Sequence, residues 1–164
     1  MSFDSRAFRS ALGTFATGVT VITTRPPGGE PLGVTVNSFA SVSLDPPLVL
    51  FSLDRASHSF DAFAAADHYV VNVLAADQQE LSRRFAKTGQ HAVDGVPHGL
   101  GAGGCPLIEG ALAQFECAIA ARYDGGDHVI YLGRVLGINV ADGGDPLVYF
   151  RSRYADLAPE PSAA

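Results

Sequence analysis

Residues 19–36 read VTVITTRPPGGEPLGVTV, and this stretch decides the class of fold. Its first part, residues 19–24, is a run rich in β-branched residues, which favour strands. Residues 25–29 hold two prolines and two glycines, a composition typical of a turn. Residues 32–36 are again strand-like. The stretch therefore predicts an antiparallel hairpin.

More strand-like runs follow the hairpin along the chain. They cover residues 48–53, 69–74, 115–123, 129–140 and 146–150. Residues 129–140 are apolar at most positions of both alternating faces, which predicts a long strand buried on two sides. Between residues 125 and 127 the sequence Gly-Gly-Asp predicts a tight turn.

Three short helices are expected beside these strands. Phe8, Leu12 and Phe15 have the spacing of one helix face, with Asp4 or Ser5 as the N-cap. The other two helices are expected over residues 57–66 and 77–87. Their inward-facing residues are expected to be Phe60, Phe63, Leu81 and Phe85.

Residues 88–106 hold six glycines and two prolines and are expected to form a long, irregular, mobile loop. Gly99, Gly101 and Gly104 match the pattern G-x-G-x-x-G. A dinucleotide fingerprint needs a strand before it and a helix after it, and neither is expected here. About seven strands joined by turns or short helices predict a mainly β fold, an antiparallel barrel with peripheral helices.

Length and charge narrow the class of protein. The 164 residues predict a single domain over residues 1–157 and a flexible tail over residues 158–164. The net charge of −6 argues against nucleic acid as a partner. No apolar run is long enough for a membrane span, and the start MSFDSRAFRS lacks the apolar core of a secretory signal. Cys105 and Cys117 are expected to be buried or free thiols of a cytoplasmic protein.

Histidine and cysteine spacing indicates no metal site. The five histidines are His58, His68, His91, His98 and His128. None of them forms a recognised ligand spacing with another or with the two cysteines. A Cys–His nucleophilic pair stays open, although no local signature supports it.

Three stretches carry weaker, positive signals. Residues 35–41 offer hydroxyl and amide donors to a planar heterocycle, or form an ordinary Asx or Ser turn. Arg55 and Ser57 at a helix start could bind an anion, or Ser57 could be a plain N-cap. His128 follows a tight turn and could present a ring nitrogen to a pocket, or could be solvated. Together they indicate a nucleotide or flavin binder.

The chain resembles the flavin reductase-like family, the small reductase components of two-component flavin-dependent monooxygenases, over about residues 6 to 157. The stretches that carry this resemblance are LGTFATGVTV (12–21), TVNSF (35–39), SLDPP (43–47), VNVL (71–74), LS (81–82), FA (85–86), GDH (126–128) and PLVYF (146–150). Their order and spacing together are specific.

The resemblance implies an FMN-binding split barrel, usually a homodimer with the flavin near the subunit interface. It also implies that NADH or NADPH reduces FMN or FAD by hydride transfer, and that the reduced flavin leaves for a partner monooxygenase. FMN against FAD, and NADH against NADPH, stay open. So do three other functions: an oxidase with tightly held FMN, a non-catalytic flavin carrier, and an interaction domain.

The resemblance also implies a set of site residues. Thr35, Asn37 and Ser38, with Val36 and Phe39 beside them, match the loop that binds the isoalloxazine ring. Near the ribityl and phosphate groups the matching residues are Ser41, Ser52, Leu53, Asp54 and Ser57. Arg84 and Phe85 match a second flavin-contacting segment. His128 matches the catalytic position on the nicotinamide side, and Tyr154 is a weaker candidate for that side.

Overall fold

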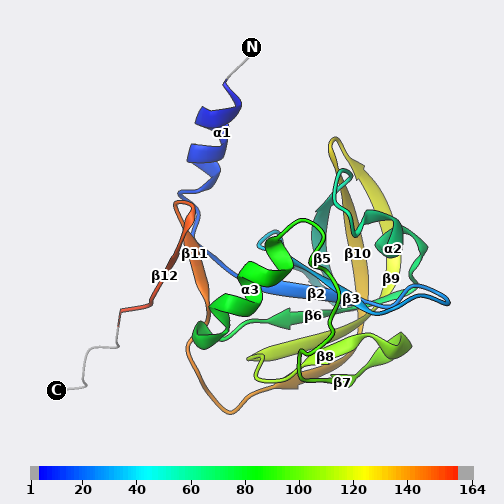
Figure 1. Ribbon diagram of the computed structural model, residues 1–164. Coiled ribbons are helices and arrows are strands. Elements are labelled where there is room, and N and C mark those ends of the chain that lie inside the picture. The colour runs from blue at the N-terminus through cyan, green and yellow to red at the C-terminus, as the bar shows by residue number, and fades with distance from the viewer. Residues whose placement is uncertain (1–3, 159–164) are drawn as a thin grey trace.

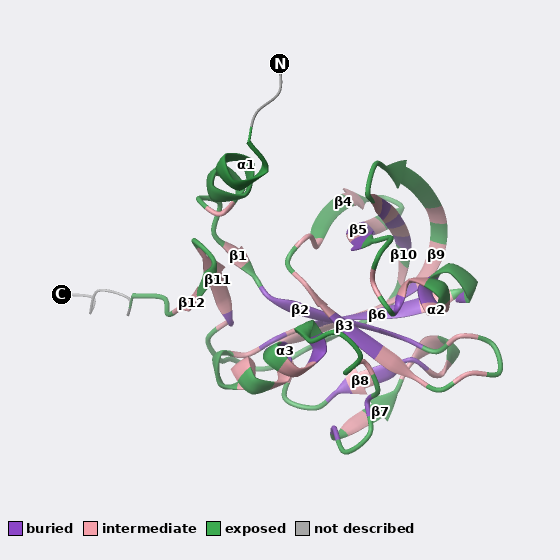
Figure 2. Cartoon of the chain, turned by 45° about the horizontal axis from the view of Figure 1, so that its top comes forward, coloured by how far each residue is buried: buried purple, intermediate pink, exposed green. Residues whose placement is uncertain are grey.

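A computed structural model describes residues 4–158 (Figure 1). Its central feature is a seven-stranded antiparallel sheet in the order β3-β2-β6-β9-β10-β5-β4. These strands are β2 (Thr20–Thr24), β3 (Leu32–Val36), β4 (Ala40–Leu44), β5 (Pro47–Asp54), β6 (His68–Val73), β9 (Ala113–Gly125) and β10 (His128–Val140). The sheet curls into a barrel, so the predicted mainly β fold is confirmed (Figures 1 and 2).

Smaller elements surround the barrel. A three-stranded sheet contains β1 (Thr17–Gly18), β11 (Val148–Phe150) and β12 (Arg153–Ala155), and a two-stranded one contains β7 (His98–Leu100) and β8 (Pro106–Ile108). The helical elements are α1 (Ser5–Leu12), α2 (Phe60–Ala65), α3 (Gln79–Ala86) and the 3₁₀ turns η1 (Ala76–Gln78) and η2 (Ala102–Gly104). No helix in residues 4–158 is long and apolar enough to cross a membrane.

The predicted hairpin is confirmed. β2 and β3 pair antiparallel, with Thr20 opposite Val36 and Thr24 opposite Leu32. Because successive strand residues point to opposite faces, Val21 and Ile22 enter different apolar clusters. Ile22 joins Phe51, Phe63, Tyr69, Val71 and Tyr131 inside the barrel. Val21 joins Val19, Leu74, Phe85 and Ile108, so α3 is held against the outer face of the sheet.

The prediction that residues 129–140 are buried on both sides is wrong for the second half of β10. Pairing with β5 ends at Arg134, so the later residues pair with β9 alone. Leu136, Ile138 and Val140 are 51%, 62% and 69% exposed. The second half of β10 is therefore apolar in sequence, yet no other element within residues 4–158 covers these side chains.

The three predicted helices are found where the sequence places them, but their ends differ from those predicted. α1 begins after Asp4, whose carboxylate accepts a hydrogen bond of 3.1 Å from the Arg6 backbone N–H. None of its residues is buried, and Phe15 lies beyond its end. α2 begins at Phe60 rather than at Ser57, because residues 54–57 form a turn closed by the Ser57 N–H and the Asp54 carbonyl at 3.0 Å.

Residues 88–106 are only partly irregular. Residues 88–97 carry no helix or strand, as predicted, but β7, η2 and β8 form a hairpin from His98 onward. The three glycines of the G-x-G-x-x-G pattern lie in this hairpin, and no α-helix follows them within residues 105–158. Cys105 and Cys117 are both buried free thiols, as predicted. The tail predicted over residues 158–164 lies, apart from Ala158, outside the described residues.

Candidate functional site

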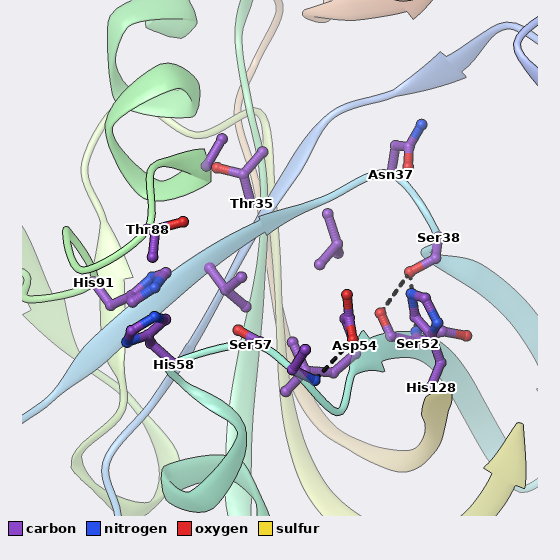
Figure 3. A pocket seen from close by; sticks show the side chains of 15 residues that line it. Thr35, Asn37, Ser38, Ser52, Asp54, Ser57, His58, Thr88, His91 and His128 are labelled. Atoms are coloured by element: carbon purple, nitrogen blue, oxygen red, sulfur yellow. Dashed lines mark hydrogen bonds between the residues drawn. The ribbon is translucent and has the colours of Figure 1, made fainter. Parts of the chain in front are cut away.

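A cavity of about 390 Å³ opens at one side of the barrel, where β3 and β5 end and β10 begins. Figure 3 shows polar side chains from these strands and from the segment after α3 converging on it. The lining residues that the sequence predicted are Thr35, Val36, Asn37, Ser38, Ser52, Leu53, Asp54, Ser57 and His128. Those that it missed are Val34, Ala56, His58, Ala86, Thr88 and His91.

The Ser38 hydroxyl ties the end of β3 to β5. Ser38 Oγ donates to the Ser52 carbonyl and accepts from the Ser52 N–H, each at 3.0 Å. These two bonds join the two sides of the curled sheet as a strand pair would. The hydroxyl is therefore engaged within the protein, and its part in the site is to hold the loop in place.

The same loop leaves donors available to a ligand. Thr35 Oγ1 donates to the Ser82 carbonyl at 2.8 Å, which fixes the end of β3 to α3. Two backbone N–H groups, those of Asn37 and Ser38, have no hydrogen-bond acceptor within residues 4–158. The side-chain amide of Asn37 has no acceptor there either. Such groups suit the polar edge of a planar heterocycle.

The end of β5 forms a polar turn at the other side of the cavity. Asp54 Oδ1 accepts from the Ala56 N–H at 2.8 Å, and Ser57 Oγ lies 2.8 Å from Ser59 Oγ. Arg55, the other residue that the sequence offered for an anion, does not line this cavity. Its guanidinium pairs with Asp124 at 2.6 Å and donates to the Gly126 carbonyl, which ties this turn to the β9–β10 turn.

His128 is the first residue of β10 and lies opposite Asp54. Its Nδ1 is 2.8 Å from Asp127 Oδ1. This hydrogen bond, followed by the charge of the imidazole, lowers the pKa of Asp127. With Nδ1–H as the donor, a neutral ring keeps Nε2 as an acceptor. The side chain is half-buried and borders the cavity beside Ser38 and Ser52 (Figure 3).

Two further histidines line the cavity and were not predicted. Figure 3 shows the rings of His58 and His91 side by side, near Ser57 and Thr88. His91 Nδ1 is 3.2 Å from the Gly33 carbonyl. The two histidines come from the loop before α2 and the segment after α3. Since only the tertiary fold brings these segments together, the spacing carried no signal.

Five predicted residues do not line this cavity. Phe39 packs on Phe115, with ring centroids 5.6 Å apart, and Ser41 is exposed in β4. The Arg84 guanidinium donates to the carbonyls of Ala92 and Asp94 at 2.9 and 2.7 Å. Phe85, on the inward face of α3, is fully buried.

Tyr154, the fifth, lines a second cavity of about 170 Å³ with Tyr149 and Ser82. Its hydroxyl is 2.9 Å from Ser82 Oγ. Thr35, Val36 and Asn37 border both cavities, so the second one adjoins the first at the end of β3.

No group of three His, Cys, Asp or Glu side chains among residues 4–158 is arranged to hold a metal ion. The cavity of about 390 Å³ instead suits an organic ligand. The free N–H groups of Asn37 and Ser38 suit a flat, polar ring, and the hydroxyls and imidazoles at the other end suit an anion. The flavin reductase-like domain family matches residues 12–158. The chain belongs to this family.

Relatives share most of the chain's length. FMN reductase (NADH) SmoA of Agrobacterium fabrum is 52% identical over 146 residues, which are 89% of this chain and 82% of the relative. The reductase subunit HsaB of a flavin-dependent monooxygenase, from Mycobacterium tuberculosis, is 40% identical over 96% of this chain and 84% of its own. The structure of the Streptomyces globisporus NADH:FAD oxidoreductase SgcE6 with NAD and FAD fragments has a TM-score of 0.89 at 39% identity, covering 98% of both chains.

Proposed function

We propose that this chain is an NAD(P)H-dependent flavin reductase that reduces FMN or FAD and supplies the reduced flavin to a separate monooxygenase. The observation that carries the proposal is the cavity beside β3, which combines free amide donors, hydroxyls and imidazoles in a member of the flavin reductase-like family. Relatives named as an NADH-dependent FMN reductase and as a monooxygenase reductase subunit support the same reaction.

The residues of the cavity fit a flavin. The N–H groups of Asn37 and Ser38 would face the polar edge of the isoalloxazine ring, where donors stabilise the negative charge that develops on reduction. Ser57, Thr88, His58 and His91 would surround the phosphate end. The bound flavin supplies the hydride acceptor, and the protein supplies placement.

His128 is assigned to the nicotinamide side. Its ring borders the cavity and is oriented by Asp127, so that Nε2 is available to position a nicotinamide amide or to exchange a proton. Holding two rings in contact with the correct alignment accounts for most of the rate in such a transfer. Tyr154, in the adjoining cavity, is assigned to the same substrate.

We further propose that the chain acts as a homodimer in the cytoplasm. Leu12 and Phe15, near α1, are 58% and 77% exposed, and Leu136, Ile138 and Val140 form an exposed apolar row on β10. Large apolar surfaces of this kind mark interaction sites. A second copy of the chain would cover them, and light scattering would then give twice the mass of 17.1 kDa.

The direct test is oxidation of NADH and of NADPH by gel-filtered protein, with and without added FMN or FAD. Oxidation that depends on added flavin supports the reductase and ranks both pairs of substrates. Flavin that stays bound through gel filtration, without NAD(P)H oxidation, indicates a carrier or an oxidase. No flavin binding and no oxidation would contradict all three enzymatic or carrier functions.

A further inference from the structure

A third cavity, of about 460 Å³, lies between α1 and the turn that joins β11 to β12. Figure 1 shows α1 next to the end of the β11–β12 hairpin. The contact is fixed by a hydrogen bond of 2.8 Å from the Arg151 N–H to the Gly13 carbonyl. The cavity is lined by Arg6, Arg9, Ser10, Gly13, Thr14, Arg151 and Ser152.

Three arginine side chains line this cavity, and no Asp or Glu is among its lining residues. Among the described residues, no Asp or Glu forms an ion pair with Arg6, Arg9 or Arg151. The whole chain has a net charge of −6 and only 11 Lys and Arg residues, so three around one cavity are a local concentration of positive charge. Guanidinium groups bind phosphate oxygens with paired N–H donors, and an anion between them would relieve their mutual repulsion.

The backbone of the turn that carries Arg151 is in an unusual conformation. Arg151 and Ser152 have φ values of 48° and 61°, which non-glycine residues adopt infrequently. Arg151 also stacks on Phe150, with Cζ 5.1 Å from the ring centroid. The turn and the stacking restrict the Arg151 side chain, so less conformational freedom would be lost when it binds a ligand.

The arginine cavity lies near the flavin cavity. The β11–β12 hairpin that carries Arg151 also carries Tyr149 and Tyr154, which line the cavity next to the end of β3.

We propose that Arg6, Arg9 and Arg151 bind the diphosphate group of a dinucleotide substrate whose ring lies in the flavin cavity. The assignment rests on the proposed function, and two dinucleotides carry this group: the pyridine dinucleotide and FAD. Hydroxyls of Ser10 and Ser152 would complete the site. All its charges are exposed, so binding should weaken as ionic strength rises.

The first experiment needs no enzymatic activity. Calorimetric titration with inorganic pyrophosphate, in the presence of excess FMN to occupy the flavin-phosphate end, would be made on the wild type and on Arg9→Gln/Arg151→Gln. We expect about tenfold weaker binding in the double variant, since two charged hydrogen-bonding groups are lost. Arg153→Gln is the control, because Arg153 is exposed on the same hairpin and does not line the cavity.

Kinetics then distinguishes the two dinucleotides. A raised KM for NADH with FMN as acceptor assigns the site to the pyridine dinucleotide. A raised KM for FAD, with those for FMN and NADH unchanged, assigns it to FAD. Unchanged pyrophosphate binding in the double variant, or an equal loss in Arg153→Gln, would overturn the site. A protein that binds pyrophosphate through these arginines but oxidises no NAD(P)H would contradict the proposed function instead.

Discussion

The ring of Tyr69 in β6 occupies the space that a Cβ atom on Gly133 in β10 would need. The two strands are not neighbours, because β9 lies between them, so the Tyr69 side chain reaches across β9 to the backbone of β10. The register of β9 and β10 shifts between Leu132 and Gly133, and Tyr69 is fully buried. Only glycine leaves room for this packing.

Gly133→Ala is therefore expected to destabilise the fold by about 1–3 kcal/mol, the usual cost of forcing an extra carbon into a filled core. Urea unfolding would measure it. Gly137→Ala is the control on the same strand, since the nearest atom to its Cβ would be Glu116 Oε1 at 3.4 Å. Equal stability losses in the two variants would contradict the steric explanation.

The barrel could be predicted from the sequence because its determinants are local. The β-branched runs on either side of the Pro-Gly turn specify β2 and β3, and the Gly-Gly-Asp turn separates β9 from β10. The exposure of Ile138 could not be predicted, because it depends on where β5 stops pairing. The family and the flavin reductase function inferred from short ordered stretches are confirmed by the family match and the relatives.

The site could be predicted only in part. Residues 35–38 and 52–54 reach the cavity because the ends of β3 and β5, which lie far apart in the sheet order, meet where the sheet closes on itself and Ser38 Oγ bonds Ser52. His58 and His91 were missed because tertiary folding alone brings their segments together. Arg84 and Phe85 lie next to a cavity segment in the sequence, but helix geometry turns Phe85 into the core and Arg84 toward the carbonyls of Ala92 and Asp94.

Ser38→Ala tests whether the Ser38–Ser52 pair holds the flavin loop. The substitution leaves the Ser52 N–H and carbonyl without their partner, which costs about 1–3 kcal/mol for a buried group and less where water enters. We expect the flavin Kd to rise about tenfold, measured by quenching of flavin fluorescence. Ser41→Ala, in exposed β4, should leave the Kd unchanged. A loss of affinity in Ser41→Ala as large as that in Ser38→Ala would contradict this reading of the loop.

Arg84→Ala tests the segment that carries Thr88 and His91. The Arg84 guanidinium bonds two carbonyls of that segment, so its removal should loosen residues 88–97 and raise both their cleavage by protease and the flavin Kd. Limited proteolysis and flavin titration would measure these effects. Arg83→Ala is the matched control for the cleavage, because this arginine pairs with Glu80 and lies over the Tyr154 ring but does not bond the carbonyls of Ala92 and Asp94. Wild-type cleavage in Arg84→Ala would refute the role.

His128→Ala separates turnover from flavin binding. If His128 orients the nicotinamide, kcat should fall about tenfold or more while the flavin Kd changes little. His58→Ala, at the other end of the same cavity, should show the converse: weaker flavin binding at nearly unchanged kcat. Steady-state kinetics and fluorescence titration measure both quantities. Equal losses of turnover and flavin affinity in His128→Ala would rule out the assignment.

Cys117 makes stability depend on alkaline pH. Burial raises the pKa of its thiol to about 12, whereas the pKa of a cysteine in an unfolded chain is about 8.5. Below about pH 8.5 both states keep the proton and the full contribution to stability is present. Above that pH only the unfolded state loses the thiol proton, so the free energy of unfolding falls by up to about 1.4 kcal/mol per pH unit.

The comparison that isolates this proton is wild type against Cys117→Ala, by urea unfolding from about pH 8 to about pH 10. The variant loses some packing at every pH, because a buried sulfur is replaced by a smaller group. Its stability should nevertheless fall less steeply with pH than that of the wild type, although the buried Cys105, whose pKa is also raised, keeps part of the slope. Parallel curves would mean that the Cys117 thiol titrates alike in the folded and unfolded chains.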